Sequence, residues 1–384
     1  MREVAVPETP RLAQVAGLFD IPVTGRSRTE WDVTLDLGAH PWNIGLVVGA
    51  SGSGKTTIAT ELWRRQIVRG FRWPRAASII DAFPAHLSIK TITGALCSVG
   101  FGSPPSWLRP WRCLSTGEQF RANLARAIAG AKGLIVYDEF TSVVDRVVAK
   151  TASAAVAKAI RRAGIQFVAV TCHADVEDWL QPDWTYRPET DRLDWRSVQR
   201  RPPIDLTIRR VHRSAWRLFK RHHYLSGTLH RAARCWVAFW GEVPVAFESA
   251  ISHPQKGGRH GLFREHRLVC LPDYQGVGIG AAFSAHIGSL FRAVGCRWTS
   301  RTAHPGLIRH RYASPLWRVN RAYDVTDPNQ LRTMRDRGIT NNQGFLPLRF
   351  AATFEYVGPP HPDAALAEQL LARTTLPQMK ASVT

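Results

Sequence analysis

The stretch LVVGASGSGKTT, residues 46 to 57, decides the fold of the first half of the chain. An apolar run leads into Gly49-x-x-x-x-Gly54-Lys55-Thr56, and the following TTIATELWRRQIV favours a helix. A strand that enters a helix through a glycine-rich turn presents backbone N–H groups to a triphosphate. We expect Lys55 to reach the outer phosphates and the Thr56 hydroxyl to bind Mg²⁺. The sequence therefore predicts a nucleotide-binding α/β domain.

A second part of this nucleotide site is expected at the end of another buried strand. GLIVYDEF, residues 133 to 140, is an apolar run that ends in Asp138 and Glu139. Asp138 is placed to hold the Mg²⁺ shell, and Glu139 to polarise the water that attacks ATP. The residues expected to contact the nucleotide from the glycine-rich turn are Gly49, Ser51, Gly52, Ser53, Gly54, Lys55, Thr56 and Thr57.

Three short motifs further along give this half a resemblance to a known family. LSTGE, residues 114 to 118, is close to the LSGGQ signature of the ABC-type ATPases. SVVD, residues 142 to 145, resembles the D-loop of that family, and His173 resembles its switch histidine. Together with the two motifs above they stand in the family's order. The resemblance therefore predicts an ABC-type ATPase domain over residues 18–195.

The resemblance also implies roles and a partner. Ser115 and Gly117 are expected to contact nucleotide, and His173 to sense the γ-phosphate. A homodimer is implied, because in this family the signature of one copy closes on the nucleotide of the other. One position departs from the pattern: the predicted strand SIIDAFPAH has Asp81 where the family has the Q-loop glutamine. A shortened helical subdomain, with no apolar run of membrane-spanning length, favours the soluble members that act on DNA over the transporters.

A second glycine-rich turn, LPDYQGVGIG at residues 271 to 280, lies in the other half of the chain. It fails as a dinucleotide fingerprint, because residue 281 is Ala where a glycine is required. Fitted as Gln275-x-x-Gly278-x-Gly280, it resembles the pyrophosphate loop of the GNAT acyltransferases. The residues that this resemblance assigns to the pyrophosphate of acetyl-CoA or another acyl-CoA are Gln275, Gly276, Val277, Gly278 and Gly280.

The segments around this turn follow the order of the GNAT fold. CWVAFWGEVPVAFESAIS predicts a hairpin that turns at Gly241-Glu242. A strand at 266–272, a helix at 280–294 and the strand CRWTSRTA are expected after it. The fold class is thus α/β, a P-loop ABC-type ATPase domain followed by an α/β GNAT acyltransferase domain. Past the last strand lies Tyr312, which is either the acid that protonates the departing thiolate or a tyrosine packed in the core.

The chain is expected to divide near residue 200, where Pro202-Pro203 interrupt a basic, polar stretch. The predicted segments are the ATPase domain at 18–195, a linker at 196–204, the GNAT-like domain at 205–357, and a C-terminal helix and tail at 358–384.

The net charge of the chain indicates what kind of partner it binds. The formal net charge is +21, and the 26 basic and 11 acidic residues of positions 201–384 supply most of it. Such a balance favours a polyanion, with nucleic acid the first candidate, although an Arg-rich proteome would also produce it. A helix expected from Ser214 carries His222-His223-Tyr224, either a catalytic or base-stacking cluster or a solvated face.

The HHY element, with SRTAHPGLIRHRYASPLW, resembles the phage Mom-type enzymes, a GNAT branch that modifies adenine in DNA. The function implied is an ATP-hydrolysing motor fused to an acyl-CoA-dependent N-acyltransferase that modifies a base, with DNA favoured over RNA. Two alternatives remain: an ATP-coupled RNA or tRNA acetyltransferase, and a DNA-remodelling ATPase with a non-catalytic GNAT-like binding module.

The six cysteines are widely spaced, and we interpret them as reduced core thiols, typical of a cytoplasmic protein without a structural zinc site.

Overall fold

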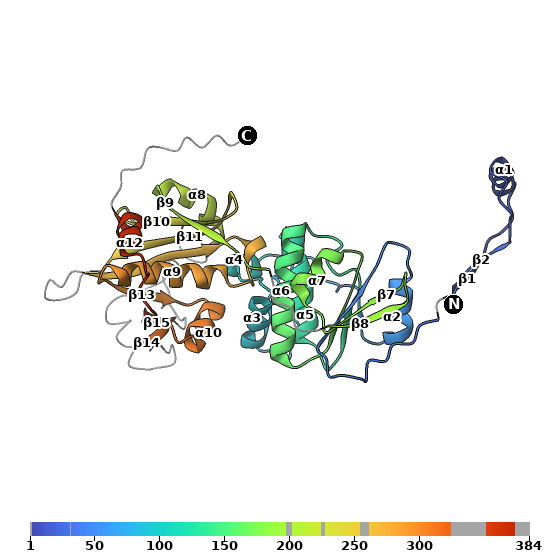
Figure 1. The fold of residues 1–384 in the computed structure, drawn as a ribbon, viewed down its shortest axis with the longest axis horizontal. Coiled ribbons are helices and arrows are strands. Elements are labelled where there is room, and N and C mark those ends of the chain that lie inside the picture. Colours follow the sequence, from blue (N-terminus) through green and yellow to red (C-terminus); the bar gives the residue numbers. More distant parts are fainter. Residues whose placement is uncertain are drawn as a thin grey trace.

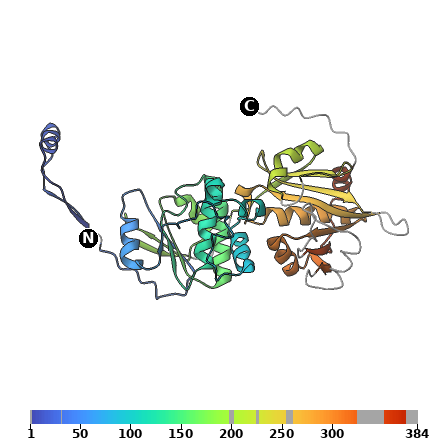
Figure 2. The ribbon, with the colours of Figure 1, turned by 180° about the vertical axis from the view of Figure 1, so that it is seen from behind.

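Two α/β halves lie side by side in the computed structural model (Figure 1). It describes residues 2–30, 32–196, 202–223, 227–253, 261–323 and 351–372. A small hairpin and helix project from the first half, as the view from behind also shows (Figure 2). Their bounds are β1 (Arg2–Ala5), α1 (Pro10–Leu18) and β2 (Arg26–Thr29). None of the helices in the described ranges combines the length and the apolar character that a membrane span requires.

The first half is built on a six-stranded sheet of order β4-β5-β6-β3-β7-β8. Its neighbouring strands are parallel except β7 and β8. The strands are β3 (Ile44–Val48), β4 (Ile67–Val68), β5 (Ile135–Tyr137), β6 (Phe167–Thr171), β7 (Trp184–Arg187) and β8 (Arg192–Trp195). Every residue of β3, β5 and β6 is buried. Continuous apolar runs such as these are typical of parallel strands that are covered on both faces.

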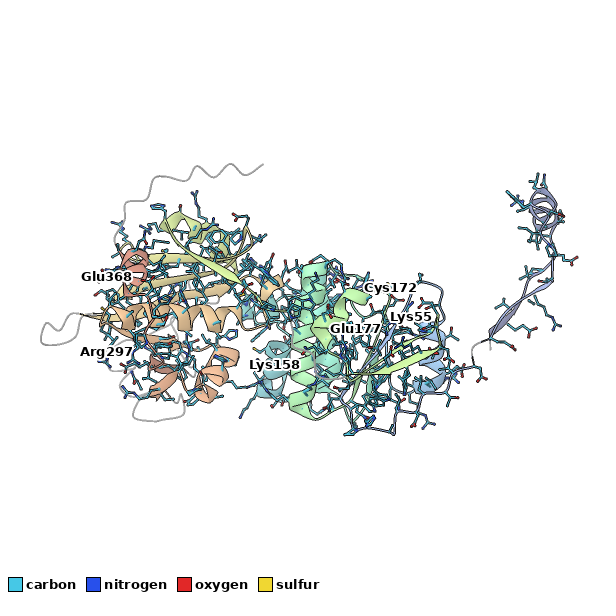
Figure 3. The ribbon with its side chains drawn as sticks, viewed as in Figure 1. Lys55, Lys158, Cys172, Glu177, Arg297 and Glu368 are labelled. Atoms are coloured by element: carbon cyan, nitrogen blue, oxygen red, sulfur yellow. The ribbon has the colours of Figure 1, made fainter. Side chains whose placement is uncertain are left out.

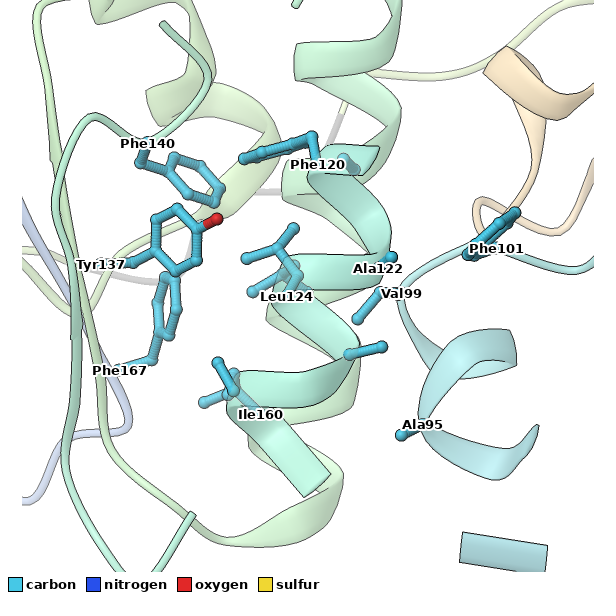
Figure 4. Close-up of a cluster of buried hydrophobic side chains, with 14 of the residues drawn as sticks. Ala95, Val99, Phe101, Phe120, Ala122, Leu124, Tyr137, Phe140, Ile160 and Phe167 are labelled. Atoms are coloured by element: carbon cyan, nitrogen blue, oxygen red, sulfur yellow. The ribbon is translucent and has the colours of Figure 1, made fainter. Parts of the chain in front are cut away.

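Helices cover both faces of this sheet (Figure 1). They are α2 (Lys55–Trp63), α3 (Ile89–Ser98), α4 (Pro104–Trp107), α5 (Thr116–Ala129), α6 (Arg146–Ala163) and α7 (Glu177–Leu180), with 3₁₀ turns η1 (Trp111–Cys113) and η2 (Ala174–Val176). Helices α3, α5 and α6 lie between the sheet and the second half, and α2 packs on the opposite face. Aromatic rings from α5 and the strands form the centre of the core (Figure 4). Phe120, for example, meets Tyr137 edge to face with ring centroids 6.0 Å apart. Helix α5 is thereby fixed between the sheet and α3.

The second half has a seven-stranded sheet of order β14-β15-β13-β12-β11-β10-β9. The strands are β9 (Leu206–Val211), β10 (Arg234–Trp240), β11 (Val243–Ser252), β12 (Leu262–Cys270), β13 (Arg297–Thr302), β14 (Trp317–Tyr323) and β15 (Ala351–Tyr356). The helices are η3 (Arg213–Ala215), α8 (Trp216–Phe219), η4 (Lys220–His222), η5 (Pro272–Tyr274), α9 (Ile279–Ala293), α10 (Pro305–Ala313) and α12 (Ala364–Leu371). Helix α9 packs on β11, β12 and β13, and α12 packs on α9.

The two central strands of this sheet diverge. Strands β12 and β13 are its only parallel pair among the described residues, and they pair only over Leu262–Arg264 and Arg297–Thr299. The remaining strand pairs are antiparallel. Beyond these residues β12 and β13 are no longer paired, and η5 leads from the end of β12 into α9. Ligands of open α/β sheets bind where neighbouring strands part in this way.

Several sequence predictions are confirmed by these elements. The hairpin β10–β11 turns at Gly241 and Glu242 as expected, with Gly241 at φ +61°. The order strand, turn, helix, strand is present as β12, η5, α9 and β13, with bounds shifted by a few residues. The C-terminal helix expected after residue 357 is present as α12, but it was expected outside the second domain, whereas it buries Ala367 and Leu371 in the core of the second half.

Three local predictions are wrong. The helix expected over TTIATELWRRQIV ends at Trp63, and Ile67–Val68 form strand β4 beside β5. SIIDAFPAH forms turns with an isolated bridge between Ser78 and Pro110 in place of a strand. The long helix expected from Ser214 is a series of short turns, of which α8 is four residues long. In each case tertiary contacts outweigh local propensity, as they do wherever a short segment is packed on both sides.

Candidate functional site

The glycine-rich turn between β3 and α2 has the geometry of a phosphate cradle. Gly52 (φ +86°) and Gly54 (φ +89°) adopt the left-handed conformation that favours glycine. Gly54 is the residue that caps α2. Lys55 folds back over the turn, where its Nζ donates to the carbonyl oxygen of Ala50 and lies 3.5 Å from Ser53 Oγ. The ammonium group therefore lies beside the residues expected to hold phosphate.

A carboxylate occupies this cradle. The backbone N–H of Ala50 donates to Oε1 of Glu189, which lies on the turn between β7 and β8. A Cβ added to Gly49 would lie 2.7 Å from the same oxygen. The carboxylate stands in for the anionic oxygens of a phosphate, so the turn is shown to accept a negatively charged group. Sequence reasoning did not predict this contact, because Glu189 resembles any acidic residue of a surface turn.

The residues expected to hold Mg²⁺ are already in contact. Thr56 Oγ1 donates to Oδ1 of Asp138, at 3.0 Å, and Asp138 is almost fully buried. Arg69 Nε reaches Oδ2 of the same carboxylate at 3.3 Å. Arg69 therefore neutralises the carboxylate at the position where a cation would bind. A hydroxyl and a carboxylate are hard oxygen ligands of the kind that Mg²⁺ prefers, so the pair fits that ion.

Glu139 follows Asp138 in sequence, but its carboxylate contacts Ser142. Glu139 has φ +54°, a conformation uncommon for a residue with a side chain. Ser142 Oγ donates to its Oε2 at 2.6 Å, so the segment that resembles a D-loop holds the carboxylate in place. His173 lies near by, with Nδ1 3.4 Å from Thr141 Oγ1. The carboxylate of Glu139 is thus bound to Ser142, apart from the Thr56–Asp138 pair.

The signature motif begins α5 through a capping box. Ser115 Oγ accepts from the N–H of Glu118 at 3.3 Å, and Glu118 Oε2 accepts from the N–H of Ser115 at 3.0 Å. Ser106 also donates to Glu118, at 2.6 Å. Ser115 is exposed and Gly117 is half-buried, and a Cβ added to Gly117 would lie 3.2 Å from Val148 and 3.7 Å from Asp273. Asp81 accepts from the hydroxyl of Ser78 within its own turn.

The second glycine-rich turn leaves space above one of its glycines. Gly278 has φ +99° and caps α9, and a Cβ added there would meet nothing within 4 Å. A Cβ on Gly280 would lie 3.8 Å from that of Cys270, an ordinary contact. The N-terminus of α9, a helix of 15 residues, thus opens into free space, where its N–H groups favour an anion.

Gln275 and Gly276 of the same turn face the first half instead. Gln275 Oε1 accepts from the N–H of Gly102 at 2.7 Å, and its Nε2 donates to Ser103 Oγ at 3.1 Å. A Cβ on Gly276 would lie 2.8 Å from Gly100 Cα. Both residues were predicted to contact a pyrophosphate. In the structure the Gln275 side chain and the backbone of Gly276 contact the first half instead.

A cavity of about 890 Å³ lies beside this turn, between the two halves. It is lined by Gly276, Gly278 and Gly280, by β12 from Glu265 to Cys270, and by residues of α3, α6 and α10. His222 and His223 line it, whereas Tyr224 lies outside the described residues. Burial lowers the pKa of His222, as does the charge of Arg221. Part of the predicted histidine cluster is therefore brought to the cavity.

Tyr312 does not line this cavity. It lies on α10 outside the cavity lining, is 50% exposed, and meets Phe354 edge to face. Tyr312 therefore lies outside the cavity in which the acid for the thiolate would have to lie. Its neighbour Arg311 is instead fully buried, and its Nη2 pairs with Oε2 of Glu265 at 2.7 Å. Neither of these residues was singled out from the sequence, because a buried ion pair requires partners that are distant along the chain.

The cysteines differ in exposure. All six are free, but Cys113 and Cys172 are exposed, so the expectation of six core thiols is wrong for these two. Burial raises the pKa of the Cys97 thiol to about 11 and that of Cys270 to about 12. Both line the cavity as neutral thiols at ordinary pH.

Comparison of the sequence with protein families and with curated proteins found no match. Among solved structures, ABC ATPase cassettes resemble part of the chain. A subunit of the ABC transporter complex cbiONQ from Clostridium perfringens aligns over 38% of this chain and 72% of its own, with a TM-score of 0.32 and 18% identity. A dimeric ATP-binding cassette in a post-hydrolysis state, bound to ADP and phosphate, aligns over 41% and 87%, with a TM-score of 0.33 and 16% identity.

A third structure of this kind is a bacterial Atm1-family ABC exporter with ATP bound, which aligns over 38% of this chain and 32% of its own, with a TM-score of 0.32 and 17% identity. The chain thus has ABC ATPase cassettes as structural neighbours over about 40% of its length. At these TM-scores the likeness adds nothing to the case for a function, which depends on the site residues themselves.

Proposed function

We propose that the first half binds ATP with Mg²⁺ and hydrolyses it as an ABC-type ATPase. The observation that carries this proposal is the hydrogen bond between Thr56 and Asp138 beneath a cradle that already accepts a carboxylate. Lys55 lies beside the same turn and would neutralise the outer phosphates. Glu139, held by Ser142, would orient the attacking water. ATP would have to displace Glu189, and Mg²⁺ would have to displace Arg69.

Binding of ATP by the purified full-length chain tests this part. Lys55→Ala removes the ammonium group and should weaken ATP binding at least tenfold, as measured by calorimetry with Mg²⁺ present. Lys90→Ala, on the exposed surface of α3, is the matched control and should bind like the wild type. Equal affinity in the wild type and Lys55→Ala would contradict the assignment.

The second half we propose to be an acyl-CoA-dependent N-acyltransferase. The separation of β12 and β13, the open turn at Gly278 and the cavity that joins them support this function. The bound donor would supply a thioester, whose acyl carbon forms a C–N bond with an amine while the C–S bond breaks. Backbone N–H groups at the start of α9 would hold the pyrophosphate. His222 and His223 line the same cavity and would take the proton from the amine.

The charge of this half favours a nucleic acid as the molecule that carries the amine. Positions 201–384 hold 26 basic and 11 acidic residues. Phosphate contacts by arginines would supply most of the affinity, and the modified base would be drawn out of the stack. We therefore propose a base of DNA as the acceptor. The RNA or tRNA acetyltransferase and the non-catalytic DNA-remodelling ATPase remain the alternatives.

Two measurements separate these possibilities. Titration of acetyl-CoA into the full-length protein should show binding that Gly278→Glu abolishes, because a carboxylate would project into the free space above the turn. Equal binding by both proteins, or none by the wild type, would remove the acyltransferase from the proposal. Mass spectrometry of nucleosides from the DNA and RNA of cells that express the protein would then identify the acceptor. Affinity for DNA should also fall by about one log unit per log unit of salt for each phosphate contact.

A further inference from the structure

One face of α6 turns toward the second half. Thr151 Oγ1 donates to the carbonyl oxygen of Asp273 at 2.8 Å, and Ala155 lies against Gly276. Lys158 and Arg162 continue the same face, because positions 151, 155, 158 and 162 recur with the helical period. Both basic residues line the cavity, and Figure 3 shows Lys158 where the two halves meet. The ATPase half therefore contributes a basic stripe to the cavity wall.

The stripe is close to the second glycine-rich turn. Ala155 contacts the turn at Gly276, and Lys158 and Arg162 follow Ala155 by about 4.5 and 10.5 Å along the helix axis. Both side chains are exposed, so they lie at the mouth of the cavity and not in its floor. A ligand whose anionic group rested on the start of α9 would extend past these two residues on its way out.

The opposite wall of this mouth is also basic. Arg309 and His310 lie on α10 and line the cavity. Arg309 reaches α3, since a Cβ on Gly94 would lie 3.1 Å from its Nη2. Burial lowers the pKa of His310, and the charge of Lys158 lowers it further. The two walls are thus near enough for their charges to interact.

Helix α10 is held against the first half by His304. The Nδ1 atom of His304 accepts from the N–H of Leu307 at 3.3 Å, which leaves Nε2 to donate to the carbonyl oxygen of Gly102 at 2.8 Å. Burial lowers the pKa of this histidine, so it stays neutral and keeps that arrangement near neutral pH. The position of Arg309 and His310 relative to α6 is therefore fixed by a contact between the halves.

The cavity lining is positively charged overall. Among its described residues Glu265 is the one carboxylate, and Arg311 pairs with it at 2.7 Å while Ser284 and Ser300 donate to it. The remaining ionised lining residues are Lys158, Arg162, Arg301 and Arg309. A concentration of one sign of charge in a concave site raises the local concentration of ligands of the opposite sign.

We infer that the mouth between α6 and α10 is a phosphate subsite, built by both halves, for the 3′-phosphate of the acyl donor. Lys158 and Arg162 of the ATPase half are its ligands, with Arg309 on the facing wall. The inference rests on the proposed acyltransferase function, because the start of α9 must hold the pyrophosphate of the same molecule. The donor is then bound only where the two halves meet, and the nucleotide-hydrolysing half is part of the transferase site.

The test compares two donors that differ in one phosphate. Acetyl-CoA and its dephospho form, which lacks the 3′-phosphate, are titrated by calorimetry into full-length wild type, Lys158→Ala, Arg162→Ala and the double variant. Each single change should weaken acetyl-CoA about tenfold, since a hydrogen bond between charged groups is lost. The dephospho form should bind the wild type weakly, and its affinity should fall little further in the variants. Arg161→Ala, whose side chain contacts Gln181 and Asp183 instead, is the matched control.

The outcomes separate the two proposals. Absence of acetyl-CoA binding in the wild type would remove both the acyltransferase and the subsite. Normal binding by the double variant, or an equal loss for the two donors, would overturn the subsite alone. The same variants are also titrated with a short DNA duplex. A loss of DNA affinity without a loss of acetyl-CoA affinity would assign the basic mouth to nucleic acid and would equally overturn the subsite.

Discussion

Arg121 of α5 donates from Nη1 to the backbone carbonyl of Gln275, at 3.1 Å, and so joins the two halves of the molecule. The same guanidinium donates to the carbonyls of Val99 and Asp273 and to Thr151 Oγ1. It is 2% exposed, and burial lowers its pKa to about 10, which leaves it protonated at neutral pH. The helix that begins with the signature motif is thereby attached to the turn that begins α9.

Arg121→Ala should therefore destabilise the protein. It leaves several buried acceptors without a donor, each worth about 1–3 kcal/mol, so a loss of at least about 3 kcal/mol is expected. The midpoint of urea unfolding measures it. Arg112→Ala, an exposed residue of η1, should change the free energy of unfolding by less than about 0.5 kcal/mol. A comparable, small effect for both variants would mean that the contacts of Arg121 are dispensable.

Glu139→Gln should stop ATP hydrolysis without preventing ATP binding. The amide cannot take a proton from water, and removal of a general base typically costs about 10²–10⁴-fold in rate. Phosphate release measures the rate, and a sizing column should show dimers accumulating with ATP. Glu61→Gln, on α2, is the control with the same change of charge. Full turnover by Glu139→Gln would mean that another residue positions the water.

Glu189→Gln should strengthen ATP binding. The wild-type carboxylate accepts from the N–H of Ala50 and repels the phosphates that need the same cradle. Its neutral counterpart competes less well, so the Kd for ATP should fall about 3–10-fold. Fluorescence titration with a labelled ATP analogue measures this, again with Glu61→Gln as the control. Unchanged affinity would show that ATP displaces Glu189 without a measurable loss of binding free energy.

Gly276→Ala and Gly278→Ala should differ in their effect on stability. At Gly276 the new Cβ would lie 2.8 Å from both Gly100 Cα and Ala155 Cβ, where little can move aside. Overpacking and the left-handed backbone together should cost about 2–4 kcal/mol. At Gly278 only the backbone cost of about 1–2 kcal/mol applies, because the space is open. Thermal unfolding of both variants measures the difference, and equal shifts in Tm would contradict the close packing between the halves.

Glu248→Gln should stabilise the protein increasingly as pH rises. Glu248 is fully buried, and its pKa is raised well above the usual value by burial and then by the charge of Glu265. The folded protein therefore holds a proton that the unfolded chain releases above about pH 4.3, so stability falls with rising pH until the folded pKa is reached. Glutamine removes this loss. The Tm advantage of the variant should grow between pH 5 and pH 7, whereas Glu242→Gln, 85% exposed, should show no such trend.

Much of the fold could be predicted from local sequence motifs. The turn at Gly52 and Gly54, the strand that ends at Asp138 and the hairpin turn at Gly241 were all predictable, because each depends on residues that are neighbours in sequence. The order of β12, α9 and β13 followed from the same kind of pattern. Predictions failed where a segment was short and packed between others, as at Ile67–Val68, which pair with β5 although the sequence favours helix.

The sequence by itself determined that there are two glycine-rich turns, each between a strand and a helix, and which acidic pair belongs to the first. Only the tertiary structure decided what these turns contact. Glu189 reaches the first turn from the end of β7, the strand beside β3, and Arg121 and Lys158 approach the second from the other half of the molecule. The physical reason is that a charged residue on a helix or turn has the same local pattern whether it faces solvent or a partner. Its surroundings are fixed only when residues more than 100 positions apart are brought into contact by the packing of the two sheets.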